Sequence, residues 1–221
     1  MRLSDLLDGV VDSYVAGLEE ADGACEVDHL VADHRLVGPR SLFACIRGSR
    51  NDGHALAEAA VASGAVALLV ERRGDITARV PQILVDDVRA VVGPIAARLE
   101  GEPSSRMVVV GITGTNGKTT VAHLLDAIAT ADGRATGLLG TLGARWAGSA
   151  TTTGYTTPEA PELQALFATM QRDGVDFVSM EVSSHALTHH RVDGTRFAAV
   201  AFTNLSPEHL DLHGDLEEYF D

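Results

Sequence analysis

A strand, a glycine loop and a helix start follow one another near the middle of the chain, and together they constrain the fold most strongly. The β-branched run 108–110 leads into the glycine-containing stretch 111–117, and Lys118, Thr119 and Thr120 open a helical pattern. Glycines let backbone N–H groups face phosphate oxygens at a helix N-terminus, where a lysine adds positive charge. A threonine hydroxyl beside that lysine can bind Mg²⁺. The pattern predicts a phosphate-binding loop.

The spacing of this loop departs from the general P-loop pattern. Gly111 and Gly117 are separated by five residues instead of the usual four, and Gly114 lies between them. A glycine turn that joins a strand to a helix without binding a ligand is the alternative interpretation. Gly-Lys-Thr-Thr at the helix start favours phosphate binding, because each of these residue types has a role toward a nucleoside triphosphate.

Charge and composition narrow the classes of protein to which the chain can belong. The 221 residues carry a net charge of −14, which opposes non-specific binding to nucleic acid or to an anionic membrane surface. The acidic N-terminus is unlike a signal peptide, and no apolar run approaches the ~20 residues of a membrane span. Cys25 and Cys45 lack zinc-site spacing, which indicates two inert thiols. We expect a cytoplasmic monomer that binds no nucleic acid and does not insert into membranes.

Hydrophobic periodicity predicts alternating strands and helices on both sides of one polar linker at 100–105. Before the linker we expect a short opening helix, a helix with Asp52 as its N-cap and a further helix, with strands at 41–46, 65–70 and 83–85. After it we expect strands at 107–111, 135–139, 177–182 and 198–202, helices at 118–131 and 158–173, and a glycine- and threonine-rich loop ending at Thr157. This alternation predicts an α/β protein: a small N-terminal α/β domain at 1–101 and an incomplete P-loop-type parallel-sheet ATPase domain at 106–221.

Residues with metal-binding chemistry follow two further predicted strands. Glu181 comes at the end of the hydrophobic strand 177–182, and a loop rich in His and Asp follows Phe202. The carboxyl ends of parallel strands meet at one edge of a sheet, so both segments should lie near the phosphate loop. Taken separately, Glu181 is favoured as a Mg²⁺ ligand over a mere cap of the next turn, whereas the histidines of the loop are favoured as solvated or capping residues. Together with the phosphate loop they favour Mg-nucleotide catalysis.

The same segments resemble the Mur ligases, including the extra residue in the ATP loop. Several of them are similar to the MurE branch, whose members add the third amino acid to UDP-N-acetylmuramoyl-L-alanyl-D-glutamate. The resemblance runs from Met1 to Asp221 and rests on the segments 33–35, 48–54, 111–120, 156–159, 181–187 and 203–214.

The resemblance implies a role for each matching residue. It implies that ATP phosphates are bound by Gly114, Thr115, Asn116, Gly117, Lys118, Thr119 and Thr120. It implies that Thr119 and Glu181 hold one Mg²⁺, that His209 helps to hold a second, and that catalysis depends on Lys118, Glu181 and His209. It assigns the UDP-muramoyl-dipeptide to His34, Ser49, Arg50, Asn51, Thr156, Thr157, Ser183, His189 and Arg191. His34, Tyr155 and His189 depart from the serine, asparagine and glutamine that are usual in the family.

The implied activity is ATP-dependent amide-bond formation in peptidoglycan synthesis. ATP would convert the substrate carboxylate to an acyl phosphate, which the incoming amino acid then attacks, while Mg²⁺ and lysine offset the developing charge. The amino acid added remains open between meso-diaminopimelate, lysine and another. Two alternatives also stay open: another Mur-superfamily ligase, and a non-catalytic truncated homologue that binds nucleotide or UDP-muramoyl peptide.

The family continues beyond the position that matches Asp221, with a carbamylated lysine, the rest of the ATPase domain and a third domain for the amino acid. Whether the 221 residues are a fragment or a natural short product stays open. We expect this chain alone to be catalytically inactive, with residues 1 to about 99 folding independently.

Overall fold

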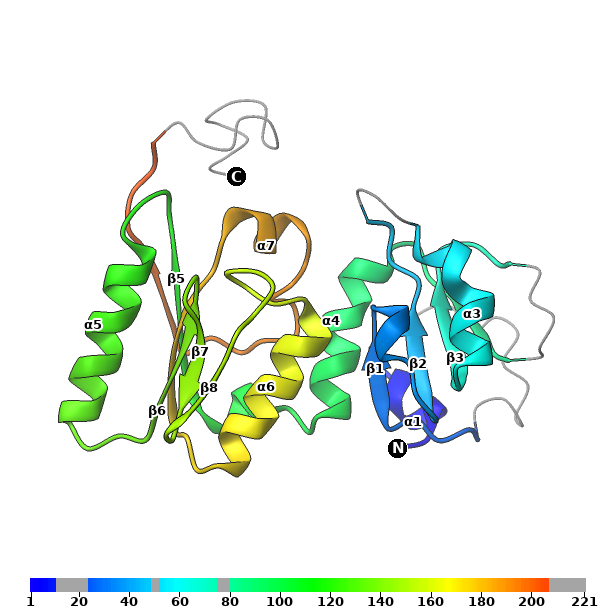
Figure 1. Ribbon diagram of the computed structural model, residues 1–221, viewed down its shortest axis with the longest axis horizontal. Coiled ribbons are helices and arrows are strands. Elements are labelled where there is room, and N and C mark those ends of the chain that lie inside the picture. The colour runs from blue at the N-terminus through cyan, green and yellow to red at the C-terminus, as the bar shows by residue number, and fades with distance from the viewer. Residues whose placement is uncertain (11–23, 49–51, 75–79, 207–221) are drawn as a thin grey trace. The chain divides into compact units, whose positions relative to one another are not determined.

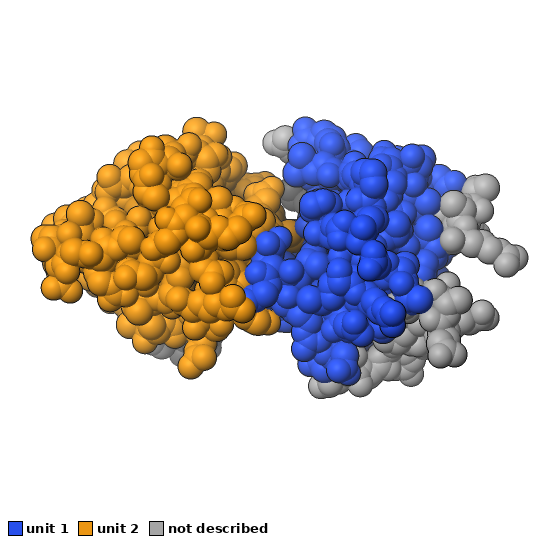
Figure 2. Space-filling model, turned by 90° about the horizontal axis from the view of Figure 1, so that it is seen from below, with its two compact units in different colours: residues 1–101 blue, residues 102–221 orange. Residues whose placement is uncertain are grey.

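The computed structural model describes residues 1–10, 24–48, 52–74 and 80–206 (Figure 1). The chain forms two compact units, Met1–Gly101 and Glu102–Asp221, which Figure 2 colours separately. The division falls inside the polar stretch 100–105, where Gly101 adopts a positive φ of 76° and Glu102 one of 57°. Each unit has its own sheet and hydrophobic core.

The first unit is built on a parallel sheet with the strand order β1-β2-β3-β4. Its strands are β1 (His29–Val31), β2 (Ser41–Ala44), β3 (Ala65–Val70) and β4 (Gln82–Leu84), and its helices are α1 (Leu3–Leu7), α3 (Ala57–Ala62) and α4 (Val88–Leu99). Strands β2 and β3 are almost wholly apolar and buried, as expected for a parallel sheet covered on both faces. One face packs against α3 through a core that includes Phe43, Ala60 and Leu68.

The second unit contains a six-stranded sheet with the order β10-β5-β9-β6-β7-β8. Its strands are β5 (Val108–Thr113), β6 (Thr136–Gly140), β7 (Gly143–Trp146), β8 (Ser149–Thr151), β9 (Phe177–Glu181) and β10 (Ala199–Phe202). The first four strands in this order pair in parallel, whereas β7 and β8 extend the sheet in antiparallel fashion. The predicted α/β class is therefore confirmed, with a mixed sheet in the second unit.

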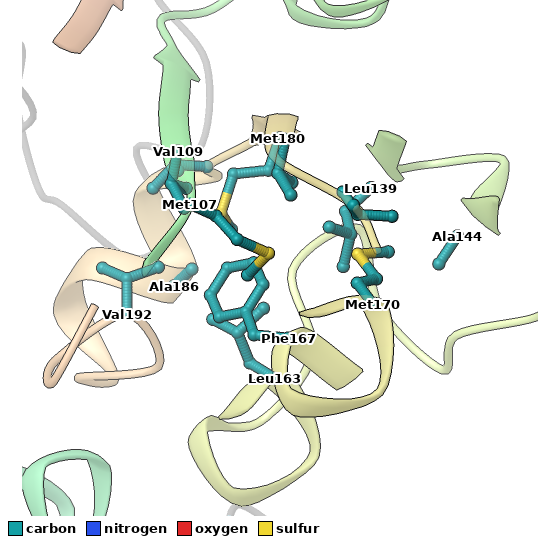
Figure 3. Packing of buried hydrophobic residues seen from close by; sticks show 13 residues of the cluster. Met107, Val109, Leu139, Ala144, Leu163, Phe167, Met170, Met180, Ala186 and Val192 are labelled. Carbon is teal, nitrogen blue, oxygen red and sulfur yellow. The ribbon is translucent and has the colours of Figure 1, made fainter. Parts of the chain in front are cut away.

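Helices α5 (Lys118–Ala131) and α6 (Ala160–Arg172) lie on opposite sides of this sheet (Figure 1). Alternate residues of a strand face opposite sides, so β5 contributes Ile112 to the core beneath α5 and Val109 to the core beneath α6. On the α6 side, Leu163 and Phe167 lie one helical turn apart and face Met107, Val109 and Met180 (Figure 3). These two layers fix the direction of the strands and thus the edge at which they end.

The predicted loop from 140 to 157 is wrong in its first half, because this stretch contains the hairpin β7–β8. Gly140 pairs with Gly143 across a two-residue turn, and Gly143 has a φ of 93°. A Cβ at Gly143 would lie 2.5 Å from the Thr151 carbonyl oxygen. The hairpin strands are only four and three residues long, so pairing with β6 stabilises them more than their own sequence does.

Five further elements in the described residues were not predicted from the sequence. They are β1, the short helix α7 (Ser184–Thr188) and the 3₁₀ turns His34–Leu36, Pro103–Arg106 and Gly53–Leu56, the last of which precedes α3. Asp52 caps this 3₁₀ turn and accepts a hydrogen bond from the His54 backbone N–H at 3.0 Å, so the predicted capping residue acts one turn before the α-helix begins.

No helix in the described part of the chain is both long enough and apolar enough to cross a bilayer.

Cys45 is fully buried in the first unit, and this burial raises the pKa of its thiol to about 12. A thiol with so high a pKa stays protonated and is a poor nucleophile, as the sequence predicted for Cys45.

Candidate functional site

The sheet order brings the three chemically informative segments of the sequence to one edge. Strands β10, β5 and β9 are neighbours and run in parallel, so the phosphate loop, Glu181 and the segment after Phe202 all lie at their carboxyl ends. Parallel α/β sheets bind ligands at this edge. The three segments therefore lie close together, as predicted, and the third of them is described up to Ser206.

The phosphate loop wraps around the amine of Lys118. Its Nζ donates hydrogen bonds to the carbonyl oxygens of Gly114 at 2.5 Å and Thr115 at 3.0 Å. Helix α5 begins at Lys118 after Gly117, whose φ is 88°. The backbone N–H groups in the first turn of a helix have no acceptor within the helix, which makes this end suited to an anion. Lys118 is also the only lysine in the sequence.

A buried carboxylate stands beside the start of α5. Glu181 is 2% exposed, and its Oε2 accepts a hydrogen bond from the Thr119 hydroxyl at 2.9 Å. Thr141, in the turn after β6, donates its backbone N–H to Oε1 at 2.9 Å and its hydroxyl to Oε2 at 3.2 Å. Both carboxylate oxygens are therefore held in place from β6 and from the phosphate loop.

Gly140 makes room for this carboxylate. It is the last residue of β6, which pairs with β9, and a Cβ at Gly140 would lie 2.0 Å from Glu181 Oε1. The paired hydroxyl and carboxylate are oxygen ligands of the kind that Mg²⁺ prefers. In the described residues no group of three or more His, Cys, Asp and Glu side chains is placed to hold a metal ion. The pair fits a Mg²⁺ that takes most of its ligands from phosphate and water.

A second cluster surrounds the buried Arg191. Its guanidinium pairs with Glu159 at 2.9 Å, donates to the Thr157 carbonyl oxygen at 3.4 Å and lies over the Tyr155 ring at 4.2 Å from its centroid. Its Nε is buried without a hydrogen-bond partner among the residues that the structure describes. The contacts with Glu159 and Tyr155 fix the plane of this guanidinium, which gives the cluster a positively charged group of defined orientation.

Thr157 connects this cluster to the carboxylate. Its buried hydroxyl donates to the Glu181 carbonyl oxygen at 2.9 Å and accepts the Ser183 N–H at 3.2 Å. The Thr156 hydroxyl lies 3.2 Å from that of Thr141. The Ser183 hydroxyl caps α7 by accepting the Ala186 N–H.

His189 ends the same helix and meets His185 edge-on, with ring centroids 6.5 Å apart. The second unit thus brings together most of the residues that the sequence assigned to ATP, to Mg²⁺ and to the muramoyl end.

The remaining predicted residues are placed differently. His34 belongs to the first unit, in a 3₁₀ turn capped by Asp33, and its Nδ1 lies 3.7 Å from the Asp33 carboxylate. The Arg35 guanidinium lowers the pKa of Asp33 to about 2. The other four, Ser49, Arg50, Asn51 and His209, lie outside the described residues.

The Asp52-Gly53-His54 segment serves to fix the backbone of the first unit. His54 Nδ1 lies 2.7 Å from Asp52 Oδ1, while His54 Nε2 accepts the backbone N–H of Glu71 at 3.0 Å. Since Nε2 is an acceptor, Nδ1 carries the proton that faces Asp52. A Cβ at Gly53 would lie 2.8 Å from the backbone of Cys45 and Ile46, so only glycine fits there. The backbone N–H and ring of His54, with Arg72, hold the pKa of Asp52 well below its usual range.

Sequence reasoning missed three residues at the strand ends: Gly140, Thr141 and Asn204. Gly140 ends β6, and Thr141 lies in the turn between β6 and β7, in the stretch that was predicted as loop. Asn204 was quoted only as part of a longer motif, although it contacts the phosphate loop directly. The glycine at the end of β6 was the available signal, since a strand-end glycine often marks close approach by another group.

A small α/β unit followed by a phosphate-loop α/β unit, with a hydroxyl–carboxylate pair at the strand ends, defines a two-domain protein of the P-loop type. Comparison with known families makes this specific. Residues 112–221 match the Mur ligase middle domain, and residues 26–100 match the Mur ligase family catalytic domain. The chain belongs to the Mur ligase family.

Relatives of known name agree with this assignment. The chain is 41% identical over 219 residues to a UDP-N-acetylmuramoyl-L-alanyl-D-glutamate–2,6-diaminopimelate ligase of Geobacillus thermodenitrificans, which covers 99% of this chain and 44% of the relative. An enzyme of the same name from Alkalilimnicola ehrlichii is 43% identical over 230 residues, covering 99% and 45%. The chain spans less than half the length of these relatives.

Solved structures show the same fold. A UDP-N-acetylmuramoyl-L-alanyl-D-glutamate–2,6-diaminopimelate ligase matches with a TM-score of 0.82 and 26% identity, over 99% of this chain and 43% of that chain. MurF from Acinetobacter baumannii matches with a TM-score of 0.63 and 20% identity, over 99% and 44%. The fold of this chain is therefore shared with these ligases.

Proposed function

We propose that this chain is part of an ATP-dependent ligase that adds the third amino acid to UDP-N-acetylmuramoyl-L-alanyl-D-glutamate. The Thr119–Glu181 pair beside the phosphate loop is the observation that carries the proposal, because it joins an oxygen pair suited to Mg²⁺ to a helix end suited to phosphate. The names of relatives at 41% and 43% identity support the choice of substrate.

We assign the binding of the ATP phosphates to the start of α5. Lys118 would leave its carbonyl partners in the loop to reach the transferred phosphoryl group, and the N–H groups of the first helical turn would bind the other phosphate oxygens. Thr119 and Glu181 would hold Mg²⁺, with Thr141 keeping the carboxylate in place. When bound, Mg²⁺ supplies positive charge that lowers the cost of bringing two anions together.

We assign the binding of the UDP-muramoyl-dipeptide, whose carboxylate accepts the phosphoryl group, to the Arg191 cluster and to the first unit. Arg191 would orient the muramoyl-dipeptide through its guanidinium, whose plane is fixed by Glu159 and the Tyr155 ring, with Thr156, Thr157, Ser183 and His189 around it. The unit at 1–101 would bind uridine diphosphate through His34 and the segment 49–51. The substrate carboxylate would then attack the terminal phosphate of ATP, and the amine of the incoming amino acid would displace phosphate from the acyl phosphate.

Product analysis tests this function. The protein as encoded, meaning the full-length reading frame that contains these 221 residues, is mixed with UDP-N-acetylmuramoyl-L-alanyl-D-glutamate, ATP, Mg²⁺ and one amino acid at a time. The first amino acid is 2,6-diaminopimelate, because the matched relatives bear its name. We expect ADP, phosphate and a UDP-muramoyl-tripeptide, identified by mass, with lysine as the second amino acid tried. Extension of UDP-N-acetylmuramate or another precursor instead would contradict the proposal. Tight dipeptide binding without turnover would favour the non-catalytic alternative.

A further inference from the structure

Asn204, which follows β10, forms hydrogen bonds with residues 115 and 116, the part of the phosphate loop that precedes Gly117. Its side-chain Oδ1 accepts the backbone N–H of Asn116 at 3.1 Å, and its Nδ2 donates to the Asn116 carbonyl oxygen at 2.9 Å. Its own carbonyl oxygen accepts the Thr115 N–H at 2.8 Å. Asn204, two residues after the end of β10, therefore bonds to three backbone groups of Thr115 and Asn116.

The loop is shaped to receive this contact. Gly114 has a φ of 119°, and a Cβ there would lie 2.3 Å from Thr203 Oγ1 and 2.8 Å from the Asn204 carbonyl oxygen. Thr203 adds a hydroxyl bond to the Asn116 carbonyl oxygen at 2.7 Å. The glycine inside the loop thus allows the strand-end segment to lie directly against the backbone.

These bonds divide the loop into two halves with different partners. The N–H groups of Thr115 and Asn116 point to Asn204, so they are occupied by protein. The N–H groups after them belong to Gly117 and to the first turn of α5, where a helix has no internal acceptors. A phosphate would therefore be met by Gly117 to Thr120, on a loop whose other half is fixed.

We propose that Asn204 is a positioning residue for nucleotide binding, which sets the conformation of the phosphate loop without touching the phosphates. The inference rests on the proposed function and deepens it. Asn204 and Asn116 are both exposed, so their bonds bury little surface and contribute less to folding than to the geometry of the loop. Because Asn204 follows β10, the geometry of the loop depends on the pairing of β10 with β5.

The test compares Asn204→Ala with Ser206→Ala in the protein as encoded. Ser206 lies in the same segment, but its side chain reaches the loop only through a 3.4 Å contact with Asn116 Nδ2. We measure the Kd of Mg-ADP, the KM of ATP and of the UDP-muramoyl-dipeptide, kcat, and the thermal midpoint without nucleotide. For Asn204→Ala we expect a Kd and an ATP KM about tenfold higher, from the loss of two hydrogen bonds that fix the loop. The dipeptide KM and the thermal midpoint should change little, and Ser206→Ala should match the wild type.

The outcomes of these measurements distinguish failure of the proposed function from failure of the proposed role of Asn204. A wild-type protein that does not bind Mg-ADP would overturn the proposed function and this inference with it. A wild-type protein that binds Mg-ADP, with Asn204→Ala equal to it or with Ser206→Ala equally impaired, would overturn the role of Asn204 alone. If Asn204→Ala fails to fold, Asn204→Asp replaces it, because aspartate keeps the volume and the acceptor and loses the donor. Its Kd for Mg-ADP should be higher than that of the wild type also at 1 M salt, where charge repulsion is screened. An unchanged Kd there would contradict the inference.

Discussion

The Thr119 hydroxyl donates to the Glu181 carboxylate at 2.9 Å, although the two residues are 62 positions apart in the sequence. The contact joins the first turn of α5 to the end of β9, and it exists because β5 and β9 pair in parallel and end at the same edge. The same carboxylate is held by Thr141 and given room by Gly140. An ion bound there would take the place of the hydrogen bond between Thr119 and Glu181, with their oxygens as ligands, while the remaining contacts already fix the carboxylate.

Gly140→Ala should displace this carboxylate. The new Cβ would meet Glu181 Oε1 at 2.0 Å, so the buried side chain must move, and we expect a loss of about 1–3 kcal/mol in the free energy of unfolding. Urea unfolding measures this loss. Gly38→Ala is the control, since a Cβ at Gly38 has no atom within 4 Å. Equal stability of Gly140→Ala and the wild type would contradict the geometry described for Glu181.

Lys118→Ala should remove the cation from the transferred phosphoryl group. We expect kcat to fall on the order of 10³-fold, because a group that stabilises developing charge in the transition state is lost. Steady-state kinetics of the protein as encoded measure this, and near-normal turnover would rule out the role.

Since Lys118 is the only lysine in the 221 residues, amine-directed labelling of this chain reports on it and on the N-terminus alone. Mg-ADP should slow the labelling of Lys118.

Arg191→Lys should weaken binding of the muramoyl-dipeptide. Lysine keeps the charge but loses the plane that lies over Tyr155 and the fork of donors, so we expect the dipeptide KM to rise about tenfold with the ATP KM unchanged. The matched control is Arg134→Lys, because Arg134 also lies over a ring, that of Phe177, and pairs with Asp176 at the other end of β9. A similar KM change in both variants would show a general effect of arginine loss.

Asp52→Asn should destabilise the first unit in a pH-dependent way. The folded state holds the pKa of Asp52 below its unfolded value near 3.9, so the ionised carboxylate stabilises the fold above that value. The contribution begins to decrease as the pH falls below about 4, and it is lost as the pH falls through the lower pKa of the folded state. At pH 7 we expect the variant to lose about 1 kcal/mol, the usual size for a charged hydrogen bond near the surface.

Thermal unfolding from pH 7 to pH 2.5 measures the difference. The gap between the wild type and Asp52→Asn should narrow with acid. Asp86→Asn, which makes the same change in charge at an exposed position of the same unit, should show no comparable gap. A gap for Asp52→Asn that stays constant with pH would contradict the ionic role of Asp52.

The elements with strong periodicity could be predicted from the sequence. The predicted helix at 118–131 coincides with α5, and the predicted strand at 65–70 coincides with β3. Both are long, bounded by glycine or polar residues, and buried on a defined face. The position of Glu181 beside Thr119 also followed from the order of strands and helices, because parallel strands end at one edge.

What could not be predicted depends on contacts between distant parts of the chain. The strands β7 and β8 exist because β6 offers them a pairing edge, and their threonine- and glycine-rich sequence alone is typical of a loop. Thr141 reaches Glu181 from the turn that joins β6 to β7, and this turn forms only because the two strands pair. Asn204 reaches the phosphate loop only because β10 lies next to β5, a neighbour relation that its local sequence does not contain.

The Mg²⁺ dependence of ADP binding, compared between the wild type and Glu181→Gln, tests the strand-end site most directly. Titration calorimetry gives the Kd of ADP with Mg²⁺ and with EDTA, and thermal unfolding confirms that the variant is folded. In the wild type Mg²⁺ should tighten ADP binding about tenfold or more, and in Glu181→Gln this gain should vanish, because the neutral amide is a poor Mg²⁺ ligand. An equal gain from Mg²⁺ in both proteins would show that Glu181 does not hold the ion.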